Sequence, residues 1–214
     1  MMARHPAARL TIALTVITGL AWIAAQLSGA ENWATEQGGF IPLRFAGQTS
    51  GFVIPAWLTP FTATLVHGDF LHIVFNLIML VYCGRAVENV LGALPLAVLY
   101  IVGAVAAALA QYLVDPTSPV PMIGASGAIS AILAVYALLF SRNEVKPIGP
   151  IPAHWVRALW LAVGWTSVQW LLSFATSRGS YQIATAAHVG GFLVGLALAR
   201  PLLAWRYRNA QALN

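Results

Sequence analysis

The sequence contains few charged residues for its length. Only 8% of its 214 residues are Asp, Glu, Lys or Arg, while 59% are apolar. A soluble domain usually carries about 25% charged side chains, and a disordered chain is depleted in apolar ones. The scarcity of charge therefore excludes both a soluble enzyme and a disordered chain, and it predicts a membrane protein.

Cysteine is almost absent as well, since Cys83 is the single one. One cysteine excludes an intrachain disulfide framework, and the chain contains neither the C-x-x-C pair of a structural zinc site nor an H-E-x-x-H motif. The net charge is +5, but the basic residues are scattered and form no stripe with aromatic residues. We therefore expect no nucleic-acid partner, no metal and no organic cofactor.

Long apolar stretches are what the sequence has in abundance. A bilayer core about 30 Å thick requires about 20 mostly apolar helical residues. Six stretches meet or approach this length, at about 10–28, 67–84, 93–113, 124–140, 155–174 and 183–204. The first follows basic residues but precedes no clear cleavage site, so we interpret it as a retained helix rather than a signal peptide. Residues 29–66 are too rich in glycine and proline to span, and we expect a long outer loop there. The sequence thus predicts an all-α membrane protein, a six-transmembrane-helix bundle forming one domain over residues 1–214.

The distribution of basic residues predicts the orientation of these spans. If the N-terminus is cytoplasmic, the inner side contains Arg4, Arg9, Arg85, Arg142, Lys146, Arg157, Arg200, Arg206 and Arg208, and the outer side contains Arg44 and Arg178. This asymmetry follows the positive-inside rule and predicts a multi-pass protein of the plasma membrane with both termini cytoplasmic. The second, fourth and sixth spans then run from outside to inside, so their first turns lie at similar depth near the outer face.

Polar residues occur in the outer portions of these same three spans. They are His67, His72 and Asn76 in the second span, Ser126 in the fourth and His188 in the sixth. Polar groups inside a membrane are costly and indicate function unless partners satisfy them. Taken singly, Ser126 is typical of a packing contact and Asn76 of a hydrogen bond between helices. A zinc site formed by the three histidines is a further alternative, but it lacks a supporting carboxylate at this depth. An ion or proton pathway through the same histidines is another, but it leaves the G-x-S-G around Ser126 unexplained.

Glycines accompany the serine and the last histidine. Gly124 and Gly127 flank Ser126 and would let backbone or substrate approach closely. Gly191 and Gly195 form a small-xxx-small pair, which predicts a close helix-packing face rather than a chemical role.

A serine nucleophile accounts for the polar residues together. Ser126 needs a base to take its proton, and His188 is the imidazole outside the second span at this depth. Free amide groups at the start of the fourth span can stabilise an oxyanion. His72 and Asn76 are four residues apart and share one helix face, so both can add donors. Because the spans contain no carboxylate that would complete a triad, we predict a Ser–His dyad.

These motifs resemble those of the rhomboid family of intramembrane serine proteases. The resemblance extends from about Trp57 to Arg200 and rests on His67-x-x-x-x-His72-x-x-x-Asn76, the G-x-S-G of Gly124 to Gly127, and Ala187-His188-x-x-Gly191-x-x-x-Gly195. It implies Ser126 as the nucleophile and His188 as the general base. It also implies an oxyanion site formed by His72, Asn76 and the amide near Ser126, with His67 supporting the site by hydrogen bonding.

Two positions depart from the family pattern. Many members carry Trp-Arg in the first outer loop, where this chain has Trp57-Leu58. Some members place an aromatic residue four positions after the nucleophile, where this chain has Ser130. Neither departure removes a reacting group.

The predicted function is cleavage of transmembrane segments of membrane proteins by a serine endopeptidase. The fourth span, about 17 residues and about 25 Å long, is shorter than the bilayer core, so Ser126 can lie below the outer surface. The substrate segment has to unwind locally, because a helical peptide bond is shielded from attack. The alternative is a non-proteolytic rhomboid-like module that binds transmembrane helices. The lipid bilayer is the other expected partner, and the sequence indicates no oligomeric state.

Overall fold

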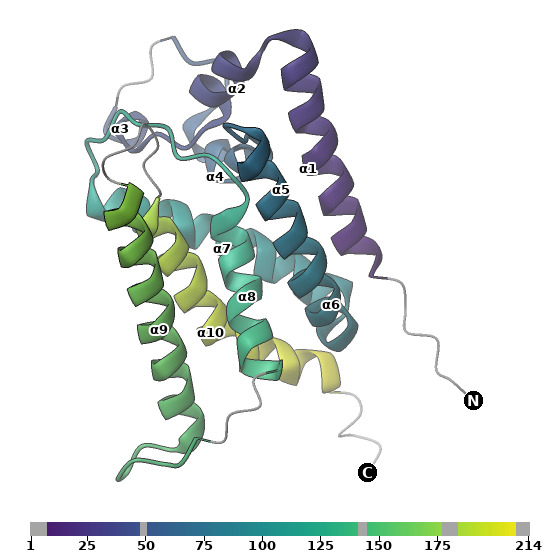
Figure 1. Cartoon of the computed structure of the whole chain (residues 1–214), viewed down its shortest axis with the longest axis vertical. Coiled ribbons are helices and arrows are strands. Elements are labelled where there is room, and N and C mark those ends of the chain that lie inside the picture. Colours follow the sequence, from purple (N-terminus) through teal and green to yellow (C-terminus); the bar gives the residue numbers. More distant parts are fainter. Residues whose placement is uncertain (1–7, 48–50, 141–144, 177–183, 209–214) are drawn as a thin grey trace.

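The protein folds into a bundle of helices (Figure 1). The computed structural model describes residues 8–47, 51–140, 145–176 and 184–208. Within these ranges the chain is helical or irregular, and extended pairing is limited to two isolated bridges, Phe40 with Met122 and Ile148 with Ile151. The predicted all-α class is therefore confirmed, while a single domain covering 1–214 stays a prediction.

Each predicted span corresponds to a helix, although the bounds differ. The helices are α1 (Arg9–Ser28), α5 (Phe70–Met79) continuing through the π-helical turn η3 (Leu80–Gly84) into α6 (Arg85–Leu91), α7 (Ala93–Val114), α8 (Ser126–Phe140), α9 (Ala153–Thr176) and α10 (Thr185–Tyr207). In the described part of the chain, four of them are long and apolar enough to cross a membrane, namely α1, the continuous helix Phe70–Leu91, α7 and α10. Helix α8 has 15 residues, or about 22 Å at the helical rise. Helix α9 carries a tryptophan at every fifth position from Trp155 to Trp170. Neither α8 nor α9 is among the four helices named above, so six crossings stay a prediction.

The second predicted span starts later and ends later than expected. Asp69 is extended and its carboxylate accepts a hydrogen bond from the His72 amide at 2.9 Å, so the helix begins at Phe70. His67 therefore precedes this helix and does not belong to it, which corrects the predicted start at residue 67. The helix passes through the π-helical turn and reaches Leu91, and Gly92, with φ of 86°, ends it.

Glu88 joins this long helix to α1. Its side chain is buried and accepts hydrogen bonds from the amides of Leu10 at 3.0 Å and Thr11 at 2.8 Å, and from the Thr11 hydroxyl at 2.6 Å. Amides in the first turn of a helix have no partner within it, so Glu88 caps α1 from a neighbouring helix. The cap fixes the position of α1 beside η3 and α6.

Helices α7, α8 and α10 form the centre of the bundle. Fully buried aliphatic side chains such as Leu96, Leu99 and Ile132 fill the space between them. Glycines bring α10 against α8, because a Cβ on Gly191 or Gly195 would clash with backbone carbonyl oxygens of α8. In Figure 1, α1 and α9 lie on opposite sides of this centre.

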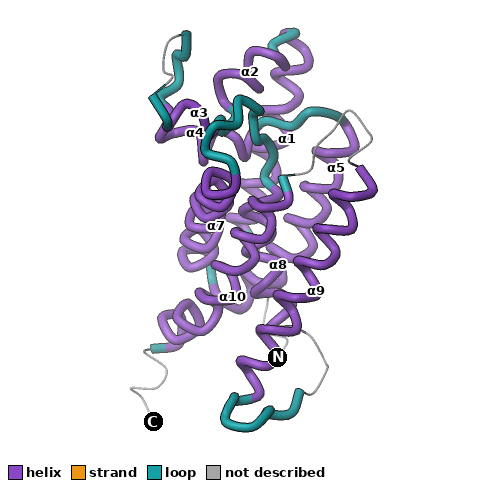
Figure 2. Tube along the Cα trace, turned by 90° about the vertical axis from the view of Figure 1, so that its left-hand side faces the viewer, coloured by secondary structure: helices purple, strands orange, loops and turns teal. Residues whose placement is uncertain are grey.

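The predicted loop 29–66 contains short helices at one end of the bundle (Figure 2). They are α2 (Glu31–Gly38), α3 (Pro42–Phe45), α4 (Thr59–Thr62) and the 3₁₀ turns η1 (Ala56–Leu58) and η2 (Ala63–Leu65). Proline at the first or second position begins α3 and α4, since the missing amide hydrogen costs nothing there. The segment is thus helical in short pieces, as its glycines and prolines allow.

A buried arginine holds this segment together. The Arg44 guanidinium donates hydrogen bonds to the carbonyl oxygens of Gln37, at 3.1 Å, and Ile54, and it lies 4.0 Å from the centre of the Phe52 ring. Burial lowers the pKa of Arg44 from its usual value. The Gln37 side chain in turn donates to the Gly51 carbonyl at 3.2 Å. Two backbone carbonyls of the segment are therefore paired with one buried cation.

Candidate active site

Ser126 is the first residue of α8, and the loop before it is held on two sides. The Gly124 amide donates to the Ala63 carbonyl at 2.9 Å, and the Ala125 amide donates to His67 Nε2 at 3.3 Å. Gly124 has φ of 106°, and a Cβ there would lie 2.5 Å from His72 Nε2 and 3.7 Å from Ser126 Oγ. Glycine is required at this position by both conformation and space. The absence of a side chain at Gly124 allows the His72 ring and the Ser126 hydroxyl to lie close to this glycine on the same side.

The serine hydroxyl lies against an imidazole from a different helix. Ser126 Oγ is 2.6 Å from Nε2 of His188, which lies in the first turn of α10. The residues are 62 positions apart in the chain. The close approach of α10 to α8 at Gly191 brings them together. The geometry is that of a hydroxyl and a base sharing one proton.

The other nitrogen of the same imidazole contacts Gln169. His188 Nδ1 is 2.7 Å from Gln169 Oε1, and Gln169 is 3% exposed on α9. One turn earlier, Trp165 Nε1 donates to the His188 carbonyl at 3.3 Å, and its ring stacks on Phe192. Helix α9 therefore contacts His188 through both its side chain and its backbone. Gln169 was not predicted as a site residue, although it is a polar residue near the outer end of the fifth predicted span.

His72 and His67 lie beside the serine loop. Asp69 fixes the start of α5 and so places His72 in its first turn. The two histidine rings are 4.9 Å apart and meet edge to face. His67 accepts the Ala125 amide, so it contacts the loop before the serine, and His72 lies against Gly124.

Asn76 follows His72 by one helical turn, as the spacing predicted. Its side chain is buried, Nδ2 donates to the His72 carbonyl at 2.9 Å, and Oδ1 has no hydrogen-bond partner. The amide nitrogen carries a second hydrogen that this bond does not use. Asn76 thus has capacity for a further donated hydrogen bond.

The two departures from the family pattern also have defined positions. Leu58 ends the 3₁₀ turn η1, next to Trp57, which is exposed. Ser130 is buried and its hydroxyl donates to the Ser126 carbonyl at 2.8 Å, one turn below the nucleophile candidate. A serine is too short to cover the His188 ring, and Gln169 makes the side-chain contact to that ring from α9 instead.

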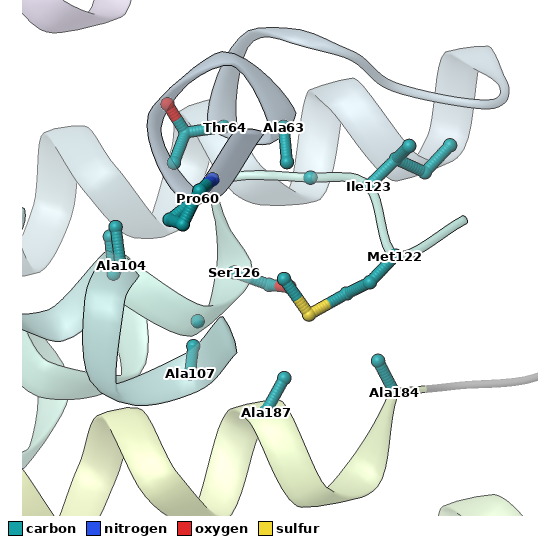
Figure 3. A pocket seen from close by; sticks show the side chains of 13 residues that line it. Pro60, Ala63, Thr64, Ala104, Ala107, Met122, Ile123, Ser126, Ala184 and Ala187 are labelled. Atoms are coloured by element: carbon teal, nitrogen blue, oxygen red, sulfur yellow. The ribbon is translucent and has the colours of Figure 1, made fainter. Parts of the chain in front are cut away.

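A small cavity lies beside Ser126 (Figure 3). Its volume is about 10 Å³, which is about the space of one water molecule. Alanines from α7 and α10 form its walls, and the side chain of Met122 lies toward Ser126. A peptide segment requires more room than this cavity alone provides.

The histidines do not form a metal cluster in the residues that the structure describes. Among residues 8–47, 51–140, 145–176 and 184–208, no group of three or more His, Cys, Asp or Glu side chains is placed to hold an ion. Each histidine of the site instead faces a protein group, namely the Ala125 amide, Gly124 or the Ser126 hydroxyl.

One known protein family matches most of the chain. The family model of the rhomboid domain matches residues 55–205. The chain belongs to the rhomboid family. Residues 55–205 include every polar residue of the site described above, and they exclude α1, α2 and α3. With its apolar helices, this rhomboid is an integral membrane protein.

Several known proteins are similar in sequence to this chain. The rhomboid is 31% identical over 200 residues to rhomboid protease GlpG of Pectobacterium atrosepticum, which is 92% of this chain and 63% of that protein. It is 37% identical over 143 residues to rhomboid protease GlpG of an Enterobacter species, covering 65% of this chain and 46% of that protein. It is 29% identical over 136 residues to mouse rhomboid-related protein 2, covering 63% and 44%. The chain thus spans less than two thirds of the length of each of these relatives.

Proposed function

We propose that this rhomboid is an intramembrane serine endopeptidase that cleaves transmembrane segments of membrane proteins with a Ser126–His188 dyad. The observation that carries the proposal is the 2.6 Å contact between Ser126 Oγ and His188 Nε2 at the start of two adjacent helices. Two of the relatives described above are named rhomboid proteases, which supports the same reaction.

The reaction follows from the groups around the serine. His188 Nε2 takes the proton of Ser126 as Oγ attacks the scissile carbonyl carbon. The carbonyl oxygen becomes an oxyanion, which first-turn amides of α8 and the side chains of His72 and Asn76 stabilise. His188 then gives the proton to the leaving amine, and the acyl-enzyme forms. Water, with its proton taken by His188, hydrolyses the acyl-enzyme and releases Ser126.

Gly124, Gly127 and His67 support these steps without reacting. Gly124 gives His72 room beside the serine, and Gly127 lets Ala107 of α7 approach the start of α8. His67 holds the Ala125 amide and so fixes the turn into α8. The proposed steps use groups of the chain and water.

The apolar walls around Ser126 indicate the kind of substrate. The cavity is small and lined largely by small residues, mainly alanines and glycines, which favours a small side chain next to the scissile bond. The segment has to leave its helical conformation to expose that bond, so helix-breaking residues near it favour cleavage.

The charge distribution supports an active site that opens to the outer side of the plasma membrane, with cytoplasmic termini. Among the inner basic residues, Arg9, Arg85, Arg157, Arg200 and Arg206 lie on described helices. Arg4, Arg142 and Arg178 lie outside the described residues.

Cleavage by a serine variant tests the proposal. Ser126→Ala should insert and melt as the unaltered rhomboid does, but it should not cleave a fluorogenic transmembrane substrate in liposomes. Full activity of Ser126→Ala would contradict the mechanism. Binding of the substrate without cleavage by the unaltered rhomboid would favour the non-proteolytic module.

A further inference from the structure

We propose that Gln169 is a positioning residue that holds His188 in the tautomer able to deprotonate Ser126. This inference rests on the proposed serine protease function. Gln169 Oε1 lies 2.7 Å from His188 Nδ1, while His188 Nε2 lies 2.6 Å from Ser126 Oγ. Ser126, His188 and Gln169 thus form a continuous chain of hydrogen bonds across α8, α10 and α9.

The nitrogen of His188 that carries the hydrogen decides whether this set of hydrogen bonds can activate Ser126. A neutral imidazole carries one hydrogen, and His188 can accept the serine proton only when that hydrogen is on Nδ1. An acceptor oxygen at Nδ1 favours this tautomer. If the amide presented its NH₂ group instead, the hydrogen would be forced onto Nε2, where it would point at Ser126 and prevent catalysis. The orientation with Oε1 facing Nδ1 is therefore the productive one.

The same acceptor remains useful after proton transfer. The imidazolium donates from both nitrogens, and Oε1 accepts from Nδ1 in that form as well. A neutral amide avoids placing a full negative charge among apolar helices, which would be costly. An amide in the third position of a catalytic set has precedent in the Cys-His-Asn arrangement.

The surroundings hold Gln169 in place. It is 3% exposed, so its amide has to be hydrogen-bonded to avoid a burial cost. Trp165 lies four residues earlier on the same face of α9, donates to the His188 carbonyl at 3.3 Å and stacks on Phe192 of α10. Ser130 hydrogen-bonds the Ser126 carbonyl rather than the imidazole. In the described part of the site, Gln169 is thus the side chain that contacts His188 Nδ1.

Substitutions that separate hydrogen bonding from packing test this role. Gln169→Leu keeps similar bulk without an acceptor, Gln169→Met replaces the amide with a thioether that accepts hydrogen bonds only weakly, and Gln169→Glu keeps an acceptor oxygen. Gln111→Leu is the matched control, because Gln111 lies on α7 and its Oε1 has no partner. For each variant, kcat and KM on one fluorogenic transmembrane substrate, the rate of Ser126 labelling by a fluorophosphonate, and the melting temperature are measured.

We expect Gln169→Leu and Gln169→Met to lower kcat and the labelling rate by about 10- to 100-fold, the range typical when the hydrogen-bond partner of a metal-binding histidine is removed. KM should stay unchanged, and Gln111→Leu should match the unaltered rhomboid. Gln169→Glu should be more active than Gln169→Leu. A packing role alone gives the opposite order, because a buried carboxylate disrupts an apolar contact more than leucine does.

The outcomes also separate this inference from the proposed function. If the unaltered rhomboid cleaves and is labelled while Gln169→Leu and Gln169→Met are equally active, the positioning role is wrong and the dyad stands. A Gln169→Glu variant less active than Gln169→Leu, with both folded, also overturns the role. If the unaltered rhomboid neither cleaves nor is labelled, the proposed function itself fails.

Discussion

At the scale of single residues, the site depends on the close approach of His72 and Ser126 to Gly124. The positive φ of Gly124 turns the chain into α8, and its missing side chain leaves room for His72 Nε2. Asn76 supports His72 from below through the 2.9 Å bond to its carbonyl. These residues lie on the side of Ser126 where we propose that the oxyanion forms, and His188 is the proposed base.

Asn76, a proposed donor to the oxyanion, and the dyad residues Ser126 and His188 should respond differently to substitution. Asn76→Ala removes one donor to the oxyanion, which typically costs about 10²–10³ in rate, so weak turnover should remain. His188→Ala removes the base and should fall to the background level of Ser126→Ala. The double variant Ser126→Ala/His188→Ala should be no worse than either single variant, because the two residues act as one unit.

These rates are compared on one fluorogenic transmembrane substrate, with folding checked by thermal melting. Robust activity in His188→Ala would contradict the dyad. A folded but fully inactive Asn76→Ala would mean that Asn76 does more than donate one hydrogen bond.

At the scale of helices, the site forms because small residues let α8 and α10 touch. Gly191 and Gly195 face backbone carbonyls of α8, and Gly103 brings α7 close to Ala131. Within a membrane such contacts stabilise helix pairs through packing rather than through the hydrophobic effect. The 2.6 Å contact between Ser126 and His188 is therefore a consequence of this close approach.

A pair of glycine variants tests the packing. Gly195→Ala places a Cβ against the Ala131 carbonyl, so it should lower the melting temperature and reduce turnover. Gly164→Ala on α9 is the control, because a Cβ there meets no atom within 4 Å. Alanine is a better helix former than glycine by up to about 1 kcal/mol, so Gly164→Ala should melt at the same temperature or higher. Equal stability of Gly195→Ala and Gly164→Ala would show that α8 and α10 are not closely packed at Gly195.

At the scale of the whole molecule, the orientation in the membrane determines which side the site faces. The N-terminal ends of α5, α8 and α10 carry His72, Ser126 and His188, and all three meet at one end of the bundle. The positive-inside rule predicts that this end lies on the outer side.

Cysteine labelling of sealed cells tests this orientation. In a Cys83→Ala background, a cysteine introduced by Thr117→Cys should react with an impermeant thiol reagent from outside, because Thr117 is exposed in the segment between α7 and α8. A cysteine introduced by Gln211→Cys, outside the described residues, should react only after the membrane is opened. Labelling of Gln211→Cys from outside would reverse the orientation and place the site toward the cytoplasm.

Local patterns made much of this architecture predictable. The apolar lengths predicted the helices, and the four-residue spacing of His72 and Asn76 predicted their shared face, since both features depend on one helix alone. The start of the second span was wrong because the Asp69 cap, rather than hydropathy, determines where α5 begins. Gln169 was missed because the predicted site rested on the second, fourth and sixth spans, whereas Gln169 lies near the outer end of the fifth. Its contact with His188 depends on how α9 packs against α10, which neither sequence segment determines.

Covalent labelling of the unaltered rhomboid tests the central claim most directly. A fluorophosphonate reacts with a serine whose hydroxyl is activated by a base. Mass spectrometry of the labelled protein should locate one adduct on Ser126, and the adduct should disappear in folded His188→Ala. An adduct on another serine, or labelling of Ser126 at an undiminished rate in His188→Ala, would contradict the proposed dyad.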